Sequence, residues 1–407
     1  MSAIRLSCSV NNYHWGKHGL HSKAAQFAAT NPDVTIDEEQ TYAELWMGTH
    51  PSGPSHVFGT TTALGDVIDE NPSAALGSSV STRYAGSLPF LFKVLSIETA
   101  LSIQAHPDKR LAQQLHAERP QVYKDGNHKP EMSIALTDFV ALSGFRPLGE
   151  IVGFLDAYPE FHALVAASAT GFREAAEGGT DGARRAALKA LFGELMKARA
   201  EDVAAQLDAL VHRSAAINGD KEETELALVR RLSSQYPGDV GVFCVFMLNV
   251  LQLRVGEAFY MGANDPHAYI SGDCVECMAT SDNVVRAGLT PKLRDVDVLV
   301  DMLTYDYGAA SHKLLQPVGH GAHVVYDPPI DEFAVVRSCV DAGQHADLEA
   351  IDGPRIMLAA EGSGTLEAGD DVLPLSPGLV YFVCPGTRCT LTAADGATLV
   401  TYTAQCE

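Results

Sequence analysis

Two short segments in which polar and apolar residues alternate constrain this chain more than any other feature. They are residues 101–107 (LSIQAHP) and residues 128–132 (HKPEM). Successive side chains of a β-strand point to opposite faces, so every second residue shares a face. In the first segment the polar side chains of one face are Ser102, Gln104 and His106. In the second segment Lys129 and Glu131 share a face. The alternation predicts two strands that present imidazole, amide and carboxylate groups together.

A metal site is the chemistry that this set of donor groups suits best. Zinc accepts imidazole nitrogens and carboxylate oxygens, and a catalytic zinc site keeps one position open for water or substrate. A second imidazole comes from His267, in a third segment expected to be a strand. We predict one Zn²⁺ per chain, with four ligands: Gln104, His106, Glu131 and His267. The Q-x-H pattern alone is also common in strands that bind no metal, so the prediction requires that the three segments meet.

Composition and charge narrow the class of protein. A chain of 407 residues, 46% of them hydrophobic, can form two or three domains with buried cores. The net charge of −22 argues against nucleic acids and anionic membranes as partners. No apolar run is long enough to span a bilayer, and the first residues do not form a secretory leader. Eight cysteines without regular spacing indicate reduced thiols and a cytoplasmic protein.

Basic residues nevertheless gather around the candidate metal segments. They are Lys93, Lys109, Lys129, Arg286, Lys292 and Arg294. In an acidic chain such a group suits a phosphate or a sugar phosphate, although ordinary surface charge is the alternative for each residue. Glu276 lies between them on an expected strand and is a candidate general base or hydrogen-bonding anchor.

The pattern of apolar residues changes twice along the chain. Short strands and turns are expected up to about residue 145. Helical spacing follows, and is clearest at Leu188, Leu191, Phe192, Leu195 and Met196. Breaks between helices are expected at residues 177–182 and 218–220, and the apolar run 240–251 is expected to be a buried helix. Strands return from residue 257, with a short helix at 295–303. The fold expected is mainly β, with an inserted helical domain.

Several longer pieces occur together in a fixed order. They are residues 13–17 (YHWGK), 42–51 (YAELWMGTHP), 89–96 (PFLFKVLS), 101–109 (LSIQAHPDK), 127–132 (NHKPEM), 266–273 (PHAYISGD) and 275–292 (VECMATSDNVVRAGLTPK). With these pieces the chain resembles the type I phosphomannose isomerases, which are zinc-dependent and related to cupins. The match covers the expected catalytic part of the chain.

The resemblance implies an architecture of two jelly-roll domains and a helical domain. The catalytic jelly roll would comprise residues 1–146 and 239–310, the helical insertion residues 147–238, and the C-terminal jelly roll residues 311–407. It also implies interconversion of mannose 6-phosphate and fructose 6-phosphate, by proton transfer between C1 and C2 through an enediolate.

The resemblance assigns roles to individual residues. The zinc ligands of the family correspond to the four residues named above, and its catalytic arginine corresponds to Arg286. Other pocket residues of the family correspond to Ser102, Lys129, Tyr269, Glu276 and Lys292. We expect Arg286, Glu276 and Lys129 to be catalytic, and Ser102, Lys93, Tyr269 and Lys292 to bind substrate. Glu276, Lys93 and Lys129 all stay open as the base that takes the C2 proton.

Two other functions fit parts of the pattern. A cupin-type metal oxygenase would also use strand-borne histidines and a carboxylate, but with iron and without the basic residues. A non-catalytic jelly roll would bind the sugar phosphate without converting it. The partner expected in the main interpretation is a small sugar phosphate, and the chain is expected to be a monomer.

Overall fold

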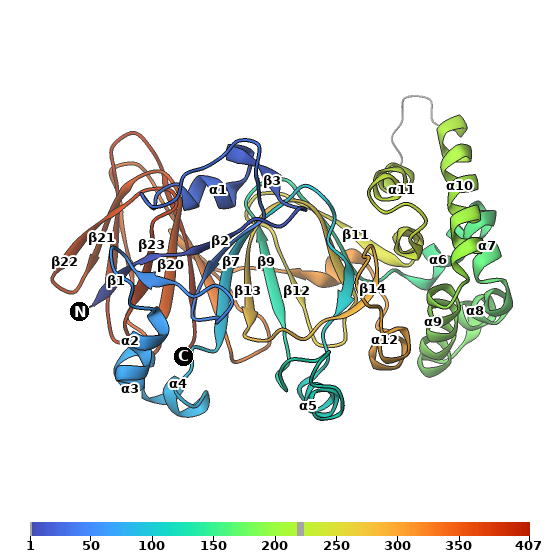
Figure 1. Cartoon of the computed structure of the whole chain (residues 1–407), viewed down its shortest axis with the longest axis horizontal. Coiled ribbons are helices and arrows are strands. Elements are labelled where there is room, and N and C mark those ends of the chain that lie inside the picture. Colours follow the sequence, from blue (N-terminus) through green and yellow to red (C-terminus); the bar gives the residue numbers. More distant parts are fainter. Residues whose placement is uncertain (1, 218–223) are drawn as a thin grey trace.

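Strands occur at both ends of the chain, and the longest helices lie between them in the sequence. The computed structural model describes residues 2–217 and 224–407. Figure 1 places a central sheet between a second group of strands on its left and the helices of residues 148–235 on its right. The predicted fold class, mainly β with a helical insertion, is confirmed.

The central sheet carries the segments of chemical interest. Its strands pair antiparallel in the order β15-β12-β9-β13-β7-β5-β2, while β10 joins β13 to β11 and β8 joins β13 to β14. The bounds are β2 (Ser9–Asn11), β5 (Glu44–Met47), β7 (Phe90–Ile97), β8 (Ile103–Ala105), β9 (Glu131–Ala135), β10 (Phe139–Phe145), β11 (Leu248–Leu253), β12 (Ala258–Met261), β13 (His267–Ala279), β14 (Val285–Gly288) and β15 (Leu314–Leu315). The segments that alternate in the sequence therefore contribute to one sheet.

Strand β13 changes partners in its middle. Its first half pairs with β10, and its second half, from Gly272 onward, pairs with β7 and β9. Gly272 has φ +112°, and a Cβ there would lie 2.5 Å from the carbonyl oxygen of Asp138. Only glycine accepts this backbone and this close approach. One strand therefore delivers both His267 and Glu276.

The helical insertion follows the apolar spacing of its sequence. Its helices are α6 (Leu148–Ala157), α7 (Pro159–Leu164), α8 (Ala166–Gly178), α9 (Asp181–Met196), α10 (Ala200–Ile217) and α11 (Thr224–Gln235). The predicted stripe of α9, from Leu188 to Met196, is buried. The predicted break at 177–182 coincides with the end of α8 and the start of α9. The predicted break at 218–220 lies outside the described residues.

Two expectations about secondary structure were wrong. The run 240–251 is a 3₁₀ helix, η2 (Val240–Phe246), followed by strand β11, because an apolar run does not distinguish a buried helix from a buried strand. The first 145 residues also contain helices besides strands. They are η1 (Gly19–His21), α1 (Lys23–Ala28), α2 (Leu64–Glu70), α3 (Pro72–Leu76), α4 (Ser78–Arg83) and α5 (Lys109–Glu118). The short helix expected at 295–303 is present as α12 (Val296–Met302).

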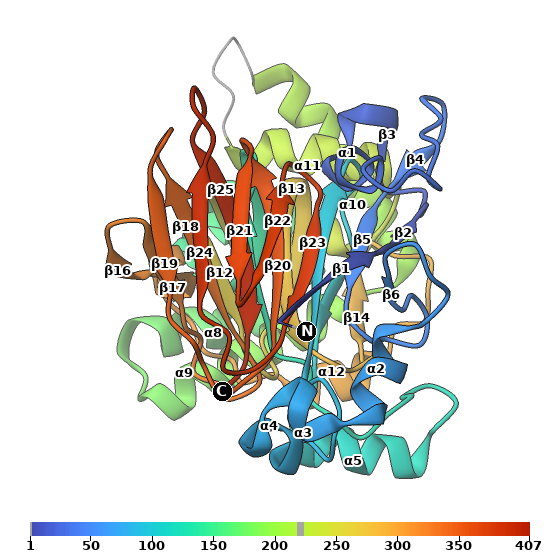
Figure 2. The ribbon, with the colours of Figure 1, turned by 90° about the vertical axis from the view of Figure 1, so that its left-hand side faces the viewer.

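The C-terminal strands form two further sheets, which face the viewer in Figure 2. The larger has the order β16-β17-β18-β25-β20-β23-β1-β6, and the smaller β19-β24-β21-β22. The bounds are β1 (Ala3–Ser7), β6 (His56–Val57), β16 (Val318–His320), β17 (His323–Tyr326), β18 (Ala334–Val340), β19 (His345–Leu348), β20 (Arg355–Glu361), β21 (Gly364–Ala368), β22 (Asp371–Leu375), β23 (Val380–Val383), β24 (Cys389–Ala393) and β25 (Leu399–Gln405). A separate pair joins β3 (Lys17–His18) to β4 (Thr41–Tyr42).

The N-terminal strand belongs to the C-terminal sheet. Strand β1 pairs with β23, from Ala3 opposite Val383 to Leu6 opposite Val380, so the first strand of the expected catalytic part joins a sheet of the C-terminal part. In the opposite direction, β15 lies beyond residue 310, after the 3₁₀ helix η3 (Ala310–Lys313), and pairs with β12 of the central sheet. Strand pairing thus links the expected catalytic and C-terminal parts in both directions, and the domain boundaries stay a prediction. One hydrophobic core, containing Phe92 and Phe382, continues across the two sheets.

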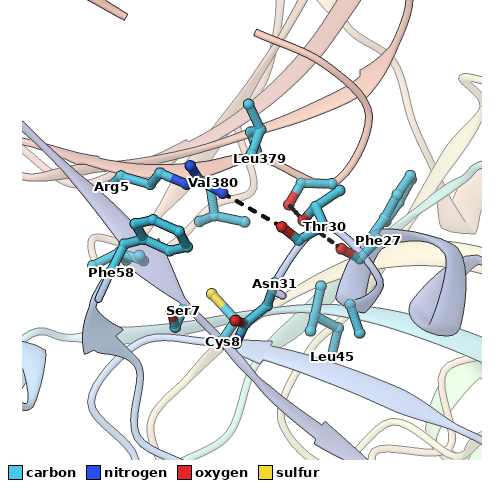
Figure 3. A pocket seen from close by; sticks show the side chains of 13 residues that line it. Arg5, Ser7, Cys8, Phe27, Thr30, Asn31, Leu45, Phe58, Leu379 and Val380 are labelled. Carbon is cyan, nitrogen blue, oxygen red and sulfur yellow. Dashed lines mark hydrogen bonds between the residues drawn. The ribbon is translucent and has the colours of Figure 1, made fainter. Parts of the chain in front are cut away.

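A small cavity of about 10 Å³ lies where β1, α1 and the start of β23 meet (Figure 3). The guanidinium of Arg5 stacks on Phe58, 3.5 Å from the ring centroid, and donates a hydrogen bond to the carbonyl oxygen of Thr30. Burial raises the pKa of the Cys8 thiol to about 12, so the thiol is neutral. This cavity has room for a single water at most and is part of the packing between the two sheets.

The part of the chain that the structure describes holds no helix with the length and apolar character needed to cross a bilayer.

Candidate active site

Three buried side chains converge at one point of the central sheet: His106 directly follows β8, Glu131 begins β9, and His267 begins β13. Nε2 of His106 and Nε2 of His267 each lie 3.3 Å from Oε2 of Glu131. The three ligand atoms lie within 4.8 Å of one another, and the three residues are at most 2% exposed. The metal prediction required the three segments that carry these residues to meet, and in the structure they do.

The remaining contacts of these residues leave the converging atoms free. Nδ1 of His106 contacts the carbonyl oxygen of Asn283 at 2.6 Å, and Nδ1 of His267 contacts that of Asp265 at 3.0 Å. A backbone carbonyl can only accept, so each Nδ1 carries the hydrogen and each Nε2 presents a lone pair. Both Nε2 atoms and Oε2 of Glu131 are buried without a hydrogen-bond partner among the described residues. Buried polar atoms left in this way are typical of a metal site.

Gln104 lies in the same row of side chains. On strand β8 it is opposite His267 of β13 on one side and Arg286 of β14 on the other. Directly opposite residues of antiparallel strands have Cβ atoms about 5 Å apart and share a face. The sheet thus places an amide and a guanidinium beside the cluster, as the proposed ligand set and the proposed catalytic arginine require.

The charges in the cluster suit a divalent cation. Burial lowers the pKa of His106 to about 4, so its contact with Glu131 is that of a neutral imidazole and no ion pair. Burial opposes ionisation of Glu131, but opposite charge, chiefly that of the Lys129 ammonium, holds its pKa well below the usual range. Nζ of Lys129 lies 2.9 Å from Oε1 of Glu131, away from the oxygen that faces the histidines. The cluster therefore offers two neutral imidazoles and one carboxylate oxygen, which fit zinc.

A second row of polar side chains crosses the sheet near the cluster. Lys93 of β7 is opposite Trp46 of β5 on one side and Glu276 of β13 on the other, and Glu276 is opposite Ser133 of β9. Nζ of Lys93 lies 3.2 Å from Oε2 of Glu276. The hydroxyl of Tyr269 donates to Oε1 of Glu276 at 2.7 Å. Glu276 is thus fixed through both oxygens.

The pKa shifts in this row distinguish Lys93 from Glu276 as candidate bases. Burial opposes protonation of Lys93, but Glu44 and Glu276 outweigh it and raise the pKa of the ammonium. Lys93 is therefore charged at neutral pH and a poor base, contrary to one option that the sequence left open. Burial raises the pKa of Glu276 above its usual range, although Lys93 acts in the opposite direction.

An open cleft of about 380 Å³ contains most of the residues proposed for the site. Those that line it are Lys93, Ser102, Gln104, Lys129, Glu131, Tyr269, Glu276, Arg286 and Lys292. Lys292 is exposed at its mouth. Two of the basic residues noted in the sequence are not in the cleft, because Lys109 is exposed on α5 and Arg294 lines an adjoining cavity.

The cleft also contains residues whose role is not evident from the sequence. Glu44 accepts a hydrogen bond from Nε1 of Trp46 at 2.8 Å and lies 3.8 Å from Nζ of Lys93. His50 lies 3.4 Å from Asp282 at the edge of the cleft. Glu44, Trp46 and His50 all belong to the piece 42–51 on which the resemblance rests, so a signal was present without an assigned role.

The neutral state of His106 predicts a pH dependence of stability. The unfolded chain protonates this histidine near pH 6.5, whereas the folded chain resists protonation until about pH 4. The unfolded state therefore binds more protons between these values, and stability falls as the pH is lowered through this window. We expect the metal-depleted protein to lose roughly 2 kcal/mol from pH 7 to pH 5 through His106, measured by urea unfolding.

The variant His106→Gln should show a smaller pH slope than the parent protein. His212→Gln is the matched control, since His212 is exposed on α10. Equal slopes for the parent and His106→Gln would contradict this account of the buried imidazole.

Sequence comparison assigns three parts of the chain to one family. Residues 3–148 match the phosphomannose isomerase type I catalytic domain, residues 164–248 its helical insertion domain, and residues 324–371 its C-terminal part. The mannose-6-phosphate isomerase of Cryptococcus neoformans is 46% identical over an alignment that covers 97% of each chain. That of Saccharomyces cerevisiae is 44% identical, with 98% of each chain covered.

Solved structures give the same result. The crystal structure of mannose 6-phosphate isomerase from Salmonella typhimurium in its apo form has a TM-score of 0.84 and 32% identity, with all of both chains covered. A zinc-bound mannose 6-phosphate isomerase gives the same TM-score, identity and coverage. The chain belongs to the type I phosphomannose isomerase family.

Proposed function

We propose that this chain is a zinc-dependent aldose–ketose isomerase that interconverts mannose 6-phosphate and fructose 6-phosphate. The observation that carries the proposal is the buried group of His106, Glu131 and His267, whose free atoms converge beside a cleft that also holds Glu276 and Arg286. One zinc ion per chain, held by these three residues and Gln104, would polarise the sugar oxygens.

The protein residues would divide the remaining chemistry between them. A base takes the proton from C2 of the open-chain sugar, the C–H electrons form the C1–C2 double bond, and the electrons of the C1 carbonyl move to O1 to give an enediolate. A proton then passes from O2 to O1, the electrons left on O2 form the C2 carbonyl, and the C1–C2 π electrons take a proton at C1. Glu276 is our first candidate for the base, since its pKa is raised and it lines the cleft. Lys129 is the second candidate. Lys93 is charged and would hold Glu276 in place.

Positive charge would bind both ends of the substrate. Burial alone shifts the pKa of Arg286, with no contribution from a carboxylate of the described residues, so its charge is free to stabilise a developing oxyanion. Ser102 and Lys292, which both line the cleft, suit the phosphate, and Tyr269 supports Glu276. A monomer in the cytoplasm, without nucleic-acid or membrane partners, stays a prediction.

Replacing Arg286 by alanine should lower kcat by about 10²-fold, because loss of one donor to a developing oxyanion has effects of this size. Zinc content should not change, since Arg286 is not among the proposed ligands. Steady-state kinetics and metal analysis of the purified variant measure both. Arg294→Ala is the matched control, as Arg294 lines only the adjoining cavity. An unchanged kcat for Arg286→Ala would remove its catalytic role.

One coupled assay tests the proposed function against its rivals. The zinc-loaded protein, given mannose 6-phosphate, should produce fructose 6-phosphate and consume no oxygen. Oxygen consumption that follows iron content would instead support the oxygenase. Binding of mannose 6-phosphate without any product would support a sugar-phosphate-binding protein.

A further inference from the structure

The carboxylate of Glu332, in the C-terminal part of the chain, contacts the segment that carries Lys129 and Glu131. Glu332 lies between β17 and β18, and its Oε1 is 2.5 Å from Nε2 of His128. The side chains are 12% and 22% exposed, so this hydrogen bond is largely shielded from water. His128 immediately precedes Lys129, yet it does not line the cleft. Glu332 thus contacts a neighbour of the site residue Lys129 without lining the cleft itself.

The segment around His128 is fixed on both sides. Before it, the carbonyl oxygen of Asn127 accepts hydrogen bonds from Ser281 and Asn283. After it, the carbonyl oxygen of Pro130 accepts one from the backbone N–H of Ala279, at 3.1 Å. His128 and Lys129 lie between these two anchors. Between them, His128 contacts Glu332 and Lys129 contacts Glu131 through their side chains.

The Glu332 side of the contact is also rigid. Strand β17 ends at Tyr326, whose hydroxyl donates to the carbonyl oxygen of Gly256 at 2.6 Å and so ties the C-terminal sheet to the turn before β12. Phe333, next to Glu332, is 2% exposed in the core shared by the two sheets. Packing of Phe333 thus holds Glu332 in place, and the sheet that carries it is attached to the central sheet.

A fixed His128 constrains its neighbour. A residue that precedes proline has a restricted backbone, so Lys129 has little freedom of its own to compensate if His128 rotates. The Lys129 ammonium must stay 2.9 Å from Oε1 of Glu131. We propose that Glu332 is a positioning residue for the isomerisation: by holding His128, it keeps Lys129 in place against Glu131. This inference rests on the proposed function for its effect on rate.

The kinetic test compares Glu332→Ala with Glu332→Gln. The alanine variant should lose about 10-fold in kcat, with KM changed by less than about twofold and zinc content unchanged. The glutamine variant should recover most of the rate, because its amide oxygen can still accept from Nε2–H of His128. Asp331→Asn is the matched control, since Asp331 is adjacent and exposed. Equal kcat for Glu332→Ala and Asp331→Asn would overturn the inference.

A second variant tests whether Glu332 acts through His128. If it does, the double variant His128→Ala/Glu332→Ala should be no slower than the slower single variant, because both changes remove the same contact. Multiplied losses in the double variant would mean that Glu332 acts by another route, and would overturn the inference.

Amide hydrogen exchange gives a readout that does not depend on activity. Peptides covering residues 125–131 should exchange faster in Glu332→Ala than in the parent and in Asp331→Asn, while peptides from β20 and β25 should not change. If the parent protein has no isomerase activity, the proposed function fails, but exchange still decides whether Glu332 orders this segment. Unchanged exchange at 125–131 would overturn the inference by itself.

Discussion

Replacing His267 by alanine should release most of the bound zinc and reduce isomerase activity by at least about 10³-fold. Nε2 of His267 is one of three buried atoms that converge without other partners, and its removal leaves two neutral donors and one carboxylate, if Gln104 is included. With one ligand fewer, zinc would bind more weakly and would no longer be positioned to polarise the substrate. Metal analysis after dialysis, followed by the coupled assay, measures both effects.

His212→Ala serves as the control for His267→Ala, because it removes an exposed imidazole of α10. It should retain zinc and full activity. Added zinc in excess should restore part of the activity of His267→Ala if weak binding is the main defect. Full activity in a metal-depleted preparation of the parent protein would contradict the metal-dependent mechanism altogether.

The local pattern of the sequence predicted which side chains share a face, and the family resemblance supplied the proposed ligand set. Alternation placed His106 on one face with Gln104, and Glu131 on one face with Lys129, and the structure brings His106 and Glu131 to His267. Helical spacing predicted the buried stripe of α9 in the same way. These features succeed because the period of the side chains is decided by neighbouring residues along the chain.

Long-range pairing could not be predicted from such patterns. Nothing in residues 3–7 indicates that β1 pairs with β23, almost 380 positions later. The apolar run 240–251 gives no period that distinguishes η2 and β11 from one buried helix. The contact between His128 and Glu332 likewise joins residues 204 positions apart. Each depends on how the sheets pack, which is a property of the whole chain.

Replacing Glu276 by glutamine should lower kcat by about 10²- to 10⁴-fold, the range expected for loss of a general base. Gln has almost the same shape, so the hydrogen bond from Tyr269 and the position opposite Lys93 can persist. Zinc content should not change, because the contacts of Glu276 are with Lys93 and Tyr269 and not with the histidines. The amide cannot take a proton from carbon, so the chemical step itself should fail.

Glu44→Gln is the matched comparison, because it also removes a buried negative charge beside Lys93. The other oxygen of Glu44 accepts a hydrogen bond from Trp46, so the role of Glu44 is to fix side chains of the cleft. Its substitution should therefore lower kcat much less than that of Glu276. A loss equal to that of Glu276→Gln would mean that the charge on Lys93, and not proton transfer, is what the two carboxylates control.

Isotope exchange separates Glu276 from Lys129 as the base. In D₂O, a base that exchanges its proton with solvent places deuterium in the product, and the rate of this incorporation follows proton removal from the sugar. We expect Glu276→Gln to abolish incorporation and Lys129→Gln to slow it. If Lys129→Gln abolishes incorporation while Glu276→Gln retains it, the lysine is the base. Complete retention of the C2 hydrogen by the parent protein would favour a hydride shift or a shielded base, since neither exchanges that hydrogen with solvent.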